Sequence, residues 1–136
     1  MACWLFKGEA ASYGWDDLVR DGGTEWDGVR NAAAAANLRA MRAGDEGLLY
    51  HSGDEKRAVG VVRVARAARP DGEGGRWASV RIEPAAPLAH PVTLARMKAE
   101  PRLAGLPMLR QPRLSVSAIG EAEWRVLREL GDRPPS

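Results

Sequence analysis

The residues best suited to specific chemistry lie in one six-residue segment, Trp26-Asp27-Gly28-Val29-Arg30-Asn31. The segment combines an aromatic ring, a carboxylate, a flexible glycine, a cation and an amide, and it runs directly into five alanines. Alanine favours helix and asparagine is a good N-cap, so the sequence predicts a helix starting after Asn31. The free N–H groups of a helix start suit an anionic or polar ligand. In a simpler interpretation, which is the commoner one for short motifs, Trp26 is a core anchor and Asn31 only a cap.

Side chains for nucleophilic catalysis are few. Cysteine and histidine are represented only by Cys3, His51 and His90, and Cys3 falls in an apolar run where a thiol is usually inert. His51 precedes Ser52, and this pair is the one candidate for activating a hydroxyl. The glycine-rich phosphate loop, the nucleophile elbow and paired metal-binding histidines are all missing from the sequence. We therefore predict no catalytic residue and no metal site, and keep a hydrolytic role for His51 and Ser52 as an alternative.

The inventory suits binding of an extruded nucleobase better than catalysis. Such a site needs an aromatic wall, polar groups for the base edge and a basic rim for the flanking phosphates. Trp26 offers the wall, and Asn31 and Ser52 offer polar groups. Strand alternation would direct Arg113 and Ser115 toward the same side. The rim would be formed by arginines, namely Arg30, Arg39, Arg42, Arg110 and Arg113. The alternative is that these arginines are solvated surface charges, as most arginines are.

Length and composition indicate a small globular protein. The 136 residues fit a single domain over residues 1–131, with a frayed tail at 132–136. The chain is 45% hydrophobic and 28% charged, and its net charge of +2 permits a nucleic-acid partner without requiring one. A single cysteine excludes an intrachain disulfide. Neither a signal peptide nor a membrane-spanning stretch is expected, so we predict a cytoplasmic protein without a membrane partner.

Apolar patterning predicts strands and helices in alternation. The expected strands are residues 2–6, 46–51, 57–68, 76–83 and 113–117, and the expected helices are residues 13–21, 32–43, 94–99 and 121–130. In the second helix Ala34, Leu38 and Met41 should face the core, with Gly44 as C-cap. Thr93 should cap the third helix. Gly60 is expected at a bulge.

The remaining segments are expected to be irregular. Residues 70–75 read as a loop, residues 101–112 look irregular, and strand pairing should break at Pro84, Pro87 and Pro91. Short strands with helices inserted between them are typical of an α+β fold in which a mostly antiparallel sheet curls toward a barrel.

The organising segment resembles the signature of the EVE domain family. The resemblance continues, in family order, through residues 37–41, 50–52, 77–80 and 113–116, so it covers nearly the whole chain. Several collinear motifs are more specific than one. The chain departs from the family at Lys7-Gly8-Glu9-Ala10, where the family usually has Lys-Ser-Glu-Pro. A serine hydroxyl and a rigid proline are thereby absent, so the local contacts of this segment are expected to differ from those of the family.

The resemblance implies a PUA-like pseudo-barrel flanked by helices and a function. EVE domains, like the YTH domains of similar fold, are taken to read modified bases, with modified cytosine in DNA favoured. On that basis we expect a monomeric, cofactor-free, non-enzymatic reader. The pocket carried over from the family consists of Lys7, Gly8, Trp26, Val29, Arg30, Asn31, His51, Ser52, Arg113 and Ser115. Alternatives are an RNA-binding or RNA-modification role, a small-molecule or hydrolytic role using His51 and Ser52, and a purely structural interaction domain.

Overall fold

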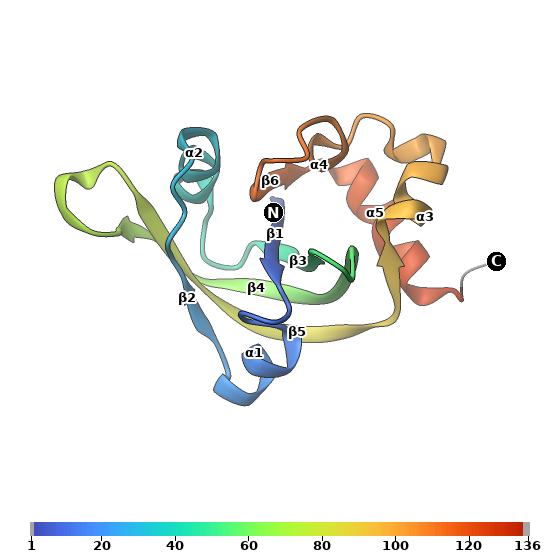
Figure 1. Cartoon of the computed structure of the whole chain (residues 1–136), viewed down its shortest axis with the longest axis horizontal. Coiled ribbons are helices and arrows are strands. Elements are labelled where there is room, and N and C mark those ends of the chain that lie inside the picture. Colours follow the sequence, from blue (N-terminus) through green and yellow to red (C-terminus); the bar gives the residue numbers. More distant parts are fainter. Residues whose placement is uncertain (1, 135–136) are drawn as a thin grey trace.

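A computed structural model describes residues 2–134 and shows one curled six-stranded sheet with helices on both faces (Figure 1). The strands are β1 (Cys3–Glu9), β2 (Thr24–Trp26), β3 (Glu46–Ser52), β4 (Arg57–Pro70), β5 (Ala78–Thr93) and β6 (Val116–Ile119). Their order in the sheet is β2-β5-β4-β3-β1-β6. Only β1 and β3 pair in parallel among these strands, so the expected α+β, mostly antiparallel half-barrel is confirmed.

The helices divide between the two faces. They are α1 (Trp15–Asp21), α2 (Ala32–Ala40), α3 (Leu94–Ala99), α4 (Pro107–Arg110) and α5 (Glu121–Asp132), with short 3-10 turns η1 (Glu73–Gly75) and η2 (Pro101–Leu103). Successive side chains of a strand point to opposite faces. Leu5, Leu48 and Tyr50 therefore join a first core with α3, α4 and α5, whereas Phe6 and Leu49 join a second core with α1 and α2. The sheet thus separates two sets of neighbours.

Local signals in the sequence fix several of these elements. Asn31 caps α2 through a 2.9 Å bond from the Ala34 N–H to its Oδ1, and Thr93 caps α3 in the same way through the Arg96 N–H. Gly60 lies at a register shift between β4 and β5, where the bulge was expected. Each of these predictions is confirmed.

The predicted boundaries of the second helix and the fourth strand are wrong. The helix ends at Ala40 with Met41 as its extended C-cap, so Gly44 instead turns the chain into β3, with a φ of 95°. The fourth strand continues past all three prolines to Thr93, with register shifts along its pairing with β4. Beyond residue 82, no described strand pairs with the edge of β5 that faces away from β4. Proline has no backbone N–H to donate, and an open edge does not need that donor.

Four further differences concern short segments. β2 is three residues long and was not predicted, and residues 101–112 contain η2 and α4. The last strand is residues 116–119 instead of 113–117, because residues 112–113 form a turn closed by a 3.0 Å bond from the Leu114 N–H to the Gln111 carbonyl. α5 includes Asp132, so the predicted tail begins too early, and residues 135–136 lie outside the described residues.

Candidate nucleic-acid interface

Trp26 ends β2 on the face of the second core. Its ring meets the Phe6 ring edge-on, with centroids 5.6 Å apart, and its outer edge covers Gly8. A Cβ atom on Gly8 would lie 3.0 Å from that edge, so the absence of a side chain allows the indole to lie close against β1. Trp26 is half-buried and borders a hollow of about 260 Å³ with Tyr13, Thr24, Glu25 and Asp27. Its contacts with Phe6 and Gly8 fit an anchor, and it is not fully buried.

Residues 28–30 are held by an aspartate from the loop between β4 and β5. Gly28 turns the chain with a φ of 73°. The Gly28 N–H and the Arg30 guanidinium each donate to Asp71 Oδ2 at 2.9 Å. The bond from Arg30, followed by that from Gly28, lowers the pKa of Asp71. Arg30 also lies over the Trp77 ring, with 5.6 Å between the guanidinium carbon and the centroid.

Asp71 and Trp77 were missed by sequence reasoning as partners of this segment. A Pro-Asp-Gly triplet indicates only a turn, and the contact with Gly28 spans 43 residues. Arg30 is therefore committed to an internal ion pair and an aromatic contact, which weakens its candidacy for a phosphate rim. Val29, between Gly28 and Arg30, is buried in the second core.

Asn31 borders a hollow of about 420 Å³ at the start of α2. We call this the α2 hollow, and its other lining residues are Ala33, Gln111, Pro112, Arg113 and Leu114. The Asn31 side chain uses Oδ1 for the helix cap, so its NH2 group is available to a ligand. Arg113 is exposed and makes no ion pair with any residue in the 2–134 range. An amide donor and an unpaired guanidinium thus share one concavity, as expected for a polar, anionic ligand.

Lys7 and Ser52 lie on the opposite face of the sheet from Trp26. They border a pocket of about 210 Å³ beside the first core, together with Tyr50, Gly53, Lys56, Leu94, Lys98, Met108, Leu109 and Pro112. We call this the lysine pocket. Lys7 Nζ donates to the Pro112 carbonyl at 2.8 Å and lies 5.9 Å from the Tyr50 ring centroid. Burial lowers the pKa of Lys7.

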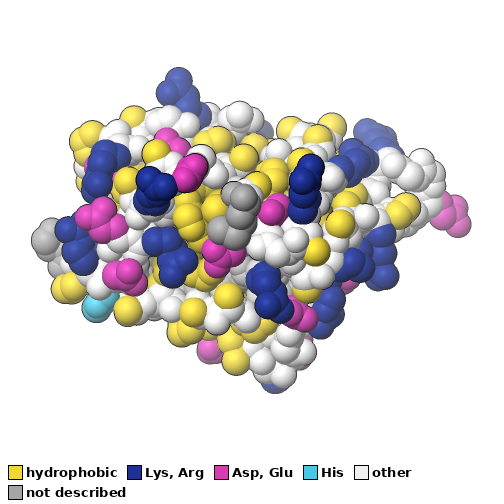
Figure 2. Space-filling view, turned by 180° about the vertical axis from the view of Figure 1, so that it is seen from behind, with side chains coloured by type: hydrophobic (Ala, Val, Ile, Leu, Met, Phe, Trp, Pro, Cys, Tyr) yellow, Lys and Arg dark blue, Asp and Glu magenta, His cyan; other side chains and the backbone are white. Residues whose placement is uncertain are grey.

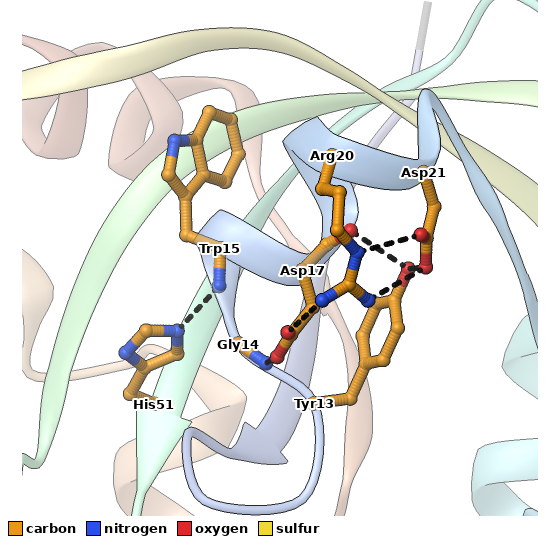
Figure 3. Close-up of polar contacts among 7 residues, drawn as sticks. All are labelled: Tyr13, Gly14, Trp15, Asp17, Arg20, Asp21 and His51. Atoms are coloured by element: carbon orange, nitrogen blue, oxygen red, sulfur yellow. Dashed lines mark hydrogen bonds and ion pairs between the residues drawn. The ribbon is translucent and has the colours of Figure 1, made fainter.

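His51 points away from Ser52, because neighbouring residues of a strand face opposite sides of the sheet. Its Nε2 accepts the Trp15 N–H at 3.1 Å, as Figure 3 shows, and its Nδ1 lies 2.9 Å from Glu55 Oε1. The bond with His51, followed by that with Arg57, lowers the pKa of Glu55. Both ring nitrogens therefore have partners, and the imidazole joins α1 to the end of β3. The arrangement does not provide the His51–Ser52 contact that hydroxyl activation needs.

The residues predicted for the phosphate rim and the last strand do not all lie together in the structure. Arg39 donates to the Arg76 carbonyl, whereas Arg42 and Arg110 are exposed and form no ion pair within residues 2–134. Ser115 precedes β6, so strand alternation does not apply to it or to Arg113. The Ser115 carbonyl instead accepts the Lys7 N–H at 2.9 Å. Five of the predicted site residues therefore line three separate hollows, namely Trp26, Asn31 with Arg113, and Lys7 with Ser52, and the other predicted residues line none of these hollows.

Other chemistry has little support. Within residues 2–134, no three His, Cys, Asp or Glu side chains gather closely enough to hold a metal ion. Cys3 is buried, and burial together with nearby Glu46 raises the pKa of its thiol to about 11, which keeps it protonated. None of the described helices is long and apolar enough to cross a membrane.

Comparison with known proteins connects this geometry to a family. The EVE domain model matches residues 2–130. An uncharacterised protein of Schizosaccharomyces pombe is 30% identical over 88% of this chain, and human thymocyte nuclear protein 1 is 25% identical over 83%. These matches cover 59% and 61% of the two relatives, so the chain spans about three fifths of the length of the curated relatives it matches.

Solved structures share the whole fold. An Agrobacterium tumefaciens protein is 34% identical, with a TM-score of 0.94 over 100% of this chain and 98% of its own. Human THYN1 protein, in complex with 5-methylcytosine containing DNA, is 24% identical, with a TM-score of 0.89 over 99% of this chain and 100% of its own. A Zygosaccharomyces rouxii YTH domain in complex with N6-methyladenosine RNA is 14% identical, with a TM-score of 0.62 over 99% of this chain and 89% of its own.

Proposed function

Because this chain belongs to the EVE domain family, we propose that it is a non-enzymatic module that binds nucleic acid carrying a modified base, with modified cytosine in DNA as the first candidate. One observation carries the proposal. A protein of the same fold, human THYN1, is found in complex with 5-methylcytosine containing DNA, and the fold correspondence extends over 99% of this chain. The α2 hollow supplies a polar donor and a cation for such a ligand.

Within this proposal, Asn31 and Arg113 have distinct roles. Asn31 would hydrogen-bond the polar edge of the extruded base, because its amide NH2 group remains available beside the capped helix end. Arg113 would contact a backbone phosphate, because it borders the same hollow without an internal ion pair among residues 2–134. Trp26 is proposed as a stacking ring, although it lines a hollow separate from the α2 hollow, so this role requires the bound nucleic acid to reach both hollows.

The second candidate is a module for modified RNA. It is favoured by the fold shared with the YTH domain found in complex with N6-methyladenosine RNA. A hydrolytic role has weaker support, since His51 contacts α1 and Glu55 while Ser52 borders the lysine pocket.

The test is a binding panel of labelled oligonucleotides that differ by one base modification, measured by fluorescence anisotropy in DNA and in RNA. We expect DNA with 5-methylcytosine to bind more tightly than the same DNA with cytosine. A preference for N6-methyladenosine RNA would instead support the second candidate, and equal weak binding to every probe would contradict both. Mass spectrometry of the recovered probe should show no chemical change, whereas turnover would overturn the non-enzymatic assignment.

A further inference from the structure

The lysines of this chain are concentrated at one place. Of 20 Lys and Arg residues only three are lysines, Lys7, Lys56 and Lys98, and all three border the lysine pocket. They come from β1, from the turn between β3 and β4, and from α3, so only the fold brings them together. None of the residues that line the pocket is acidic.

Arginine and lysine are used differently in the described part of the chain. Every ion pair to a carboxylate there is made by an arginine or by His51, and none by a lysine. The neighbouring carboxylates Glu55 and Glu100 are already bound, Glu55 by His51 and Arg57 and Glu100 by Arg102. No carboxylate lines the lysine pocket, and none of its lysines forms an ion pair within residues 2–134.

The backbone holds Lys56 over the pocket at some conformational cost. Its φ of 49° is in the left-handed region, which glycine, asparagine and aspartate adopt more readily than lysine. Its carbonyl accepts the Leu94 N–H at 2.8 Å, which ties the turn to the start of α3 and places Lys56 beside Leu94. On the opposite side, Lys7 is fixed by the Pro112 carbonyl. The Lys7 ammonium group and the Lys56 backbone are thus held in place before any ligand arrives.

We propose that the lysine pocket binds a phosphate group. Lysine acts as a compact point charge with three donors and is a common phosphate ligand. The Ser52 hydroxyl adds a neutral donor, and Tyr50, Leu94 and Met108 form an apolar floor. Three lysines around one pocket suit a small anion with several oxygens.

The pocket adjoins the proposed base site. Pro112 borders both the lysine pocket and the α2 hollow, so the segment around it separates the two. A nucleic-acid strand whose modified base enters the α2 hollow would bring a flanking phosphate to the lysines. This source of the phosphate rests on the proposed function. A free phosphate monoester is the other source of the same chemistry.

The test compares wild type with the double variant Lys56→Gln/Lys98→Gln. Both side chains are exposed, so the variant should fold, and the melting temperature checks this. Arg125→Gln is the matched control for loss of a surface charge, since Arg125 is exposed and pairs only with Glu121 among residues 2–134. Probes are an oligonucleotide with and without 5-methylcytosine, inorganic phosphate, and cytidine 5′-monophosphate.

If the phosphate belongs to the strand, the double variant should bind both oligonucleotides about tenfold more weakly, the loss expected for a hydrogen bond to a charged group. The salt dependence should also fall by about one unit of slope, with base preference unchanged. If the phosphate is free, calorimetry should show inorganic phosphate or cytidine 5′-monophosphate binding to wild type and not to the double variant. Either result supports the pocket.

The proposal is overturned if the double variant and Arg125→Gln bind every probe alike. Failure of the proposed function would look different. Wild type would then show no preference for the modified base, while binding of inorganic phosphate or of the unmodified oligonucleotide would still depend on Lys56 and Lys98.

Discussion

At the scale of single residues, the Asn31 side chain combines a cap and a free amide. Its Oδ1 accepts the Ala34 N–H, which leaves the NH2 group free, and Asn31 lines the α2 hollow with Arg113. Loss of the whole side chain removes both roles, and an N-cap alone is worth about 1 kcal/mol of stability. A substitution that keeps only the cap is therefore needed to isolate the amide.

Asn31→Asp makes that separation. Aspartate caps a helix as well as asparagine does, so we expect the variant to melt near wild type. It replaces the amide donor by a negative charge facing the ligand, so oligonucleotide affinity should be lost. Thermal melting and fluorescence anisotropy measure the two effects. Asn31→Ala is the control that should lower both, and tight binding by Asn31→Asp would reduce the amide to a cap.

Trp26 likewise combines a structural contact with a proposed ligand contact, and the two roles can be separated by experiment. Removing a large buried ring costs about 3–5 kcal/mol, and half-buried Trp26 should fall at or below this range because its contacts with Phe6 and Gly8 are lost. A stacked base is worth about 1–3 kcal/mol. For Trp26→Ala we therefore expect a lower free energy of unfolding and, at a temperature where the variant is folded, affinity weaker by about ten- to a hundredfold. A stability loss with unchanged affinity would identify Trp26 as an anchor alone.

At the scale of elements, α1 packs against bare backbone of β4. An added Cβ on Gly60 would lie 2.4 Å from the Trp15 ring, so the ring occupies the space that a side chain would need. Gly60→Ala should therefore overpack this contact and destabilise the fold by about 1–3 kcal/mol, measured by chemical denaturation. Gly105→Ala is a suitable control, because nothing lies within 4 Å of a Cβ there. Equal stability of the two variants would show that Trp15 can move aside freely.

The clamp of Asp71 on Gly28 and Arg30 makes the organising segment sensitive to acid. Because the folded-state pKa of Asp71 lies below its ordinary value of 3.8, the ionised form stabilises the fold above about pH 4, and this stabilisation is lost as the pH falls through the folded-state pKa. We expect Asp71→Asn to melt below wild type at pH 6, and the difference to shrink toward pH 3. A difference that is constant with pH would exclude a contribution from ionisation.

These elements also show which features are readable from sequence. The α2 cap, the α3 cap and the Gly60 bulge depend on residues within a few positions, so local patterns predicted them. β2 has only three residues and exists through pairing with β5, some 55 residues later, which no local pattern encodes. The strand through Pro84 depends likewise on an open sheet edge that only the tertiary fold creates.

The predicted site residues divide in the same way, between features set by local sequence and features set by long-range contacts. Asn31 as a helix cap was predicted from the motif, whereas its place at the α2 hollow beside Arg113 depends on the tertiary fold. Lys7 and Ser52 lie on the face of the sheet opposite Gly8 and His51, as strand alternation requires. That Lys7 and Ser52 share one face could be known only from the register of β1 against β3. The contact of Asp71 with Gly28 was not predicted, because the two residues are 43 positions apart in the sequence. The EVE domain resemblance is confirmed by the family match over residues 2–130.

At the scale of the whole molecule, charge is distributed rather than gathered. On the face in Figure 2 the Lys and Arg side chains are interspersed with Asp and Glu. Most arginines are held in ion pairs. Within residues 2–134 the predicted rim retains Arg39, Arg42, Arg110 and Arg113 without an ion pair, and of these Arg39 donates to the Arg76 carbonyl. Long-range attraction to nucleic acid should therefore be modest, and a few positioned cations should supply it.

The salt dependence of binding measures how many cations take part. Each neutralised phosphate contributes about −0.9 to the slope of log affinity against log salt for duplex DNA. Contacts by Arg42, Arg110 and Arg113 would therefore give about −2.7, and a phosphate bound in the lysine pocket would add about one further unit. Arg113→Ala should reduce the slope by about one and weaken binding to modified and unmodified probes alike, because phosphate contacts carry no sequence information. Arg125→Ala, which removes an exposed arginine already paired with Glu121, should leave the slope near that of wild type. Affinity independent of salt in wild type would exclude phosphate contacts and point to a neutral ligand in the α2 hollow.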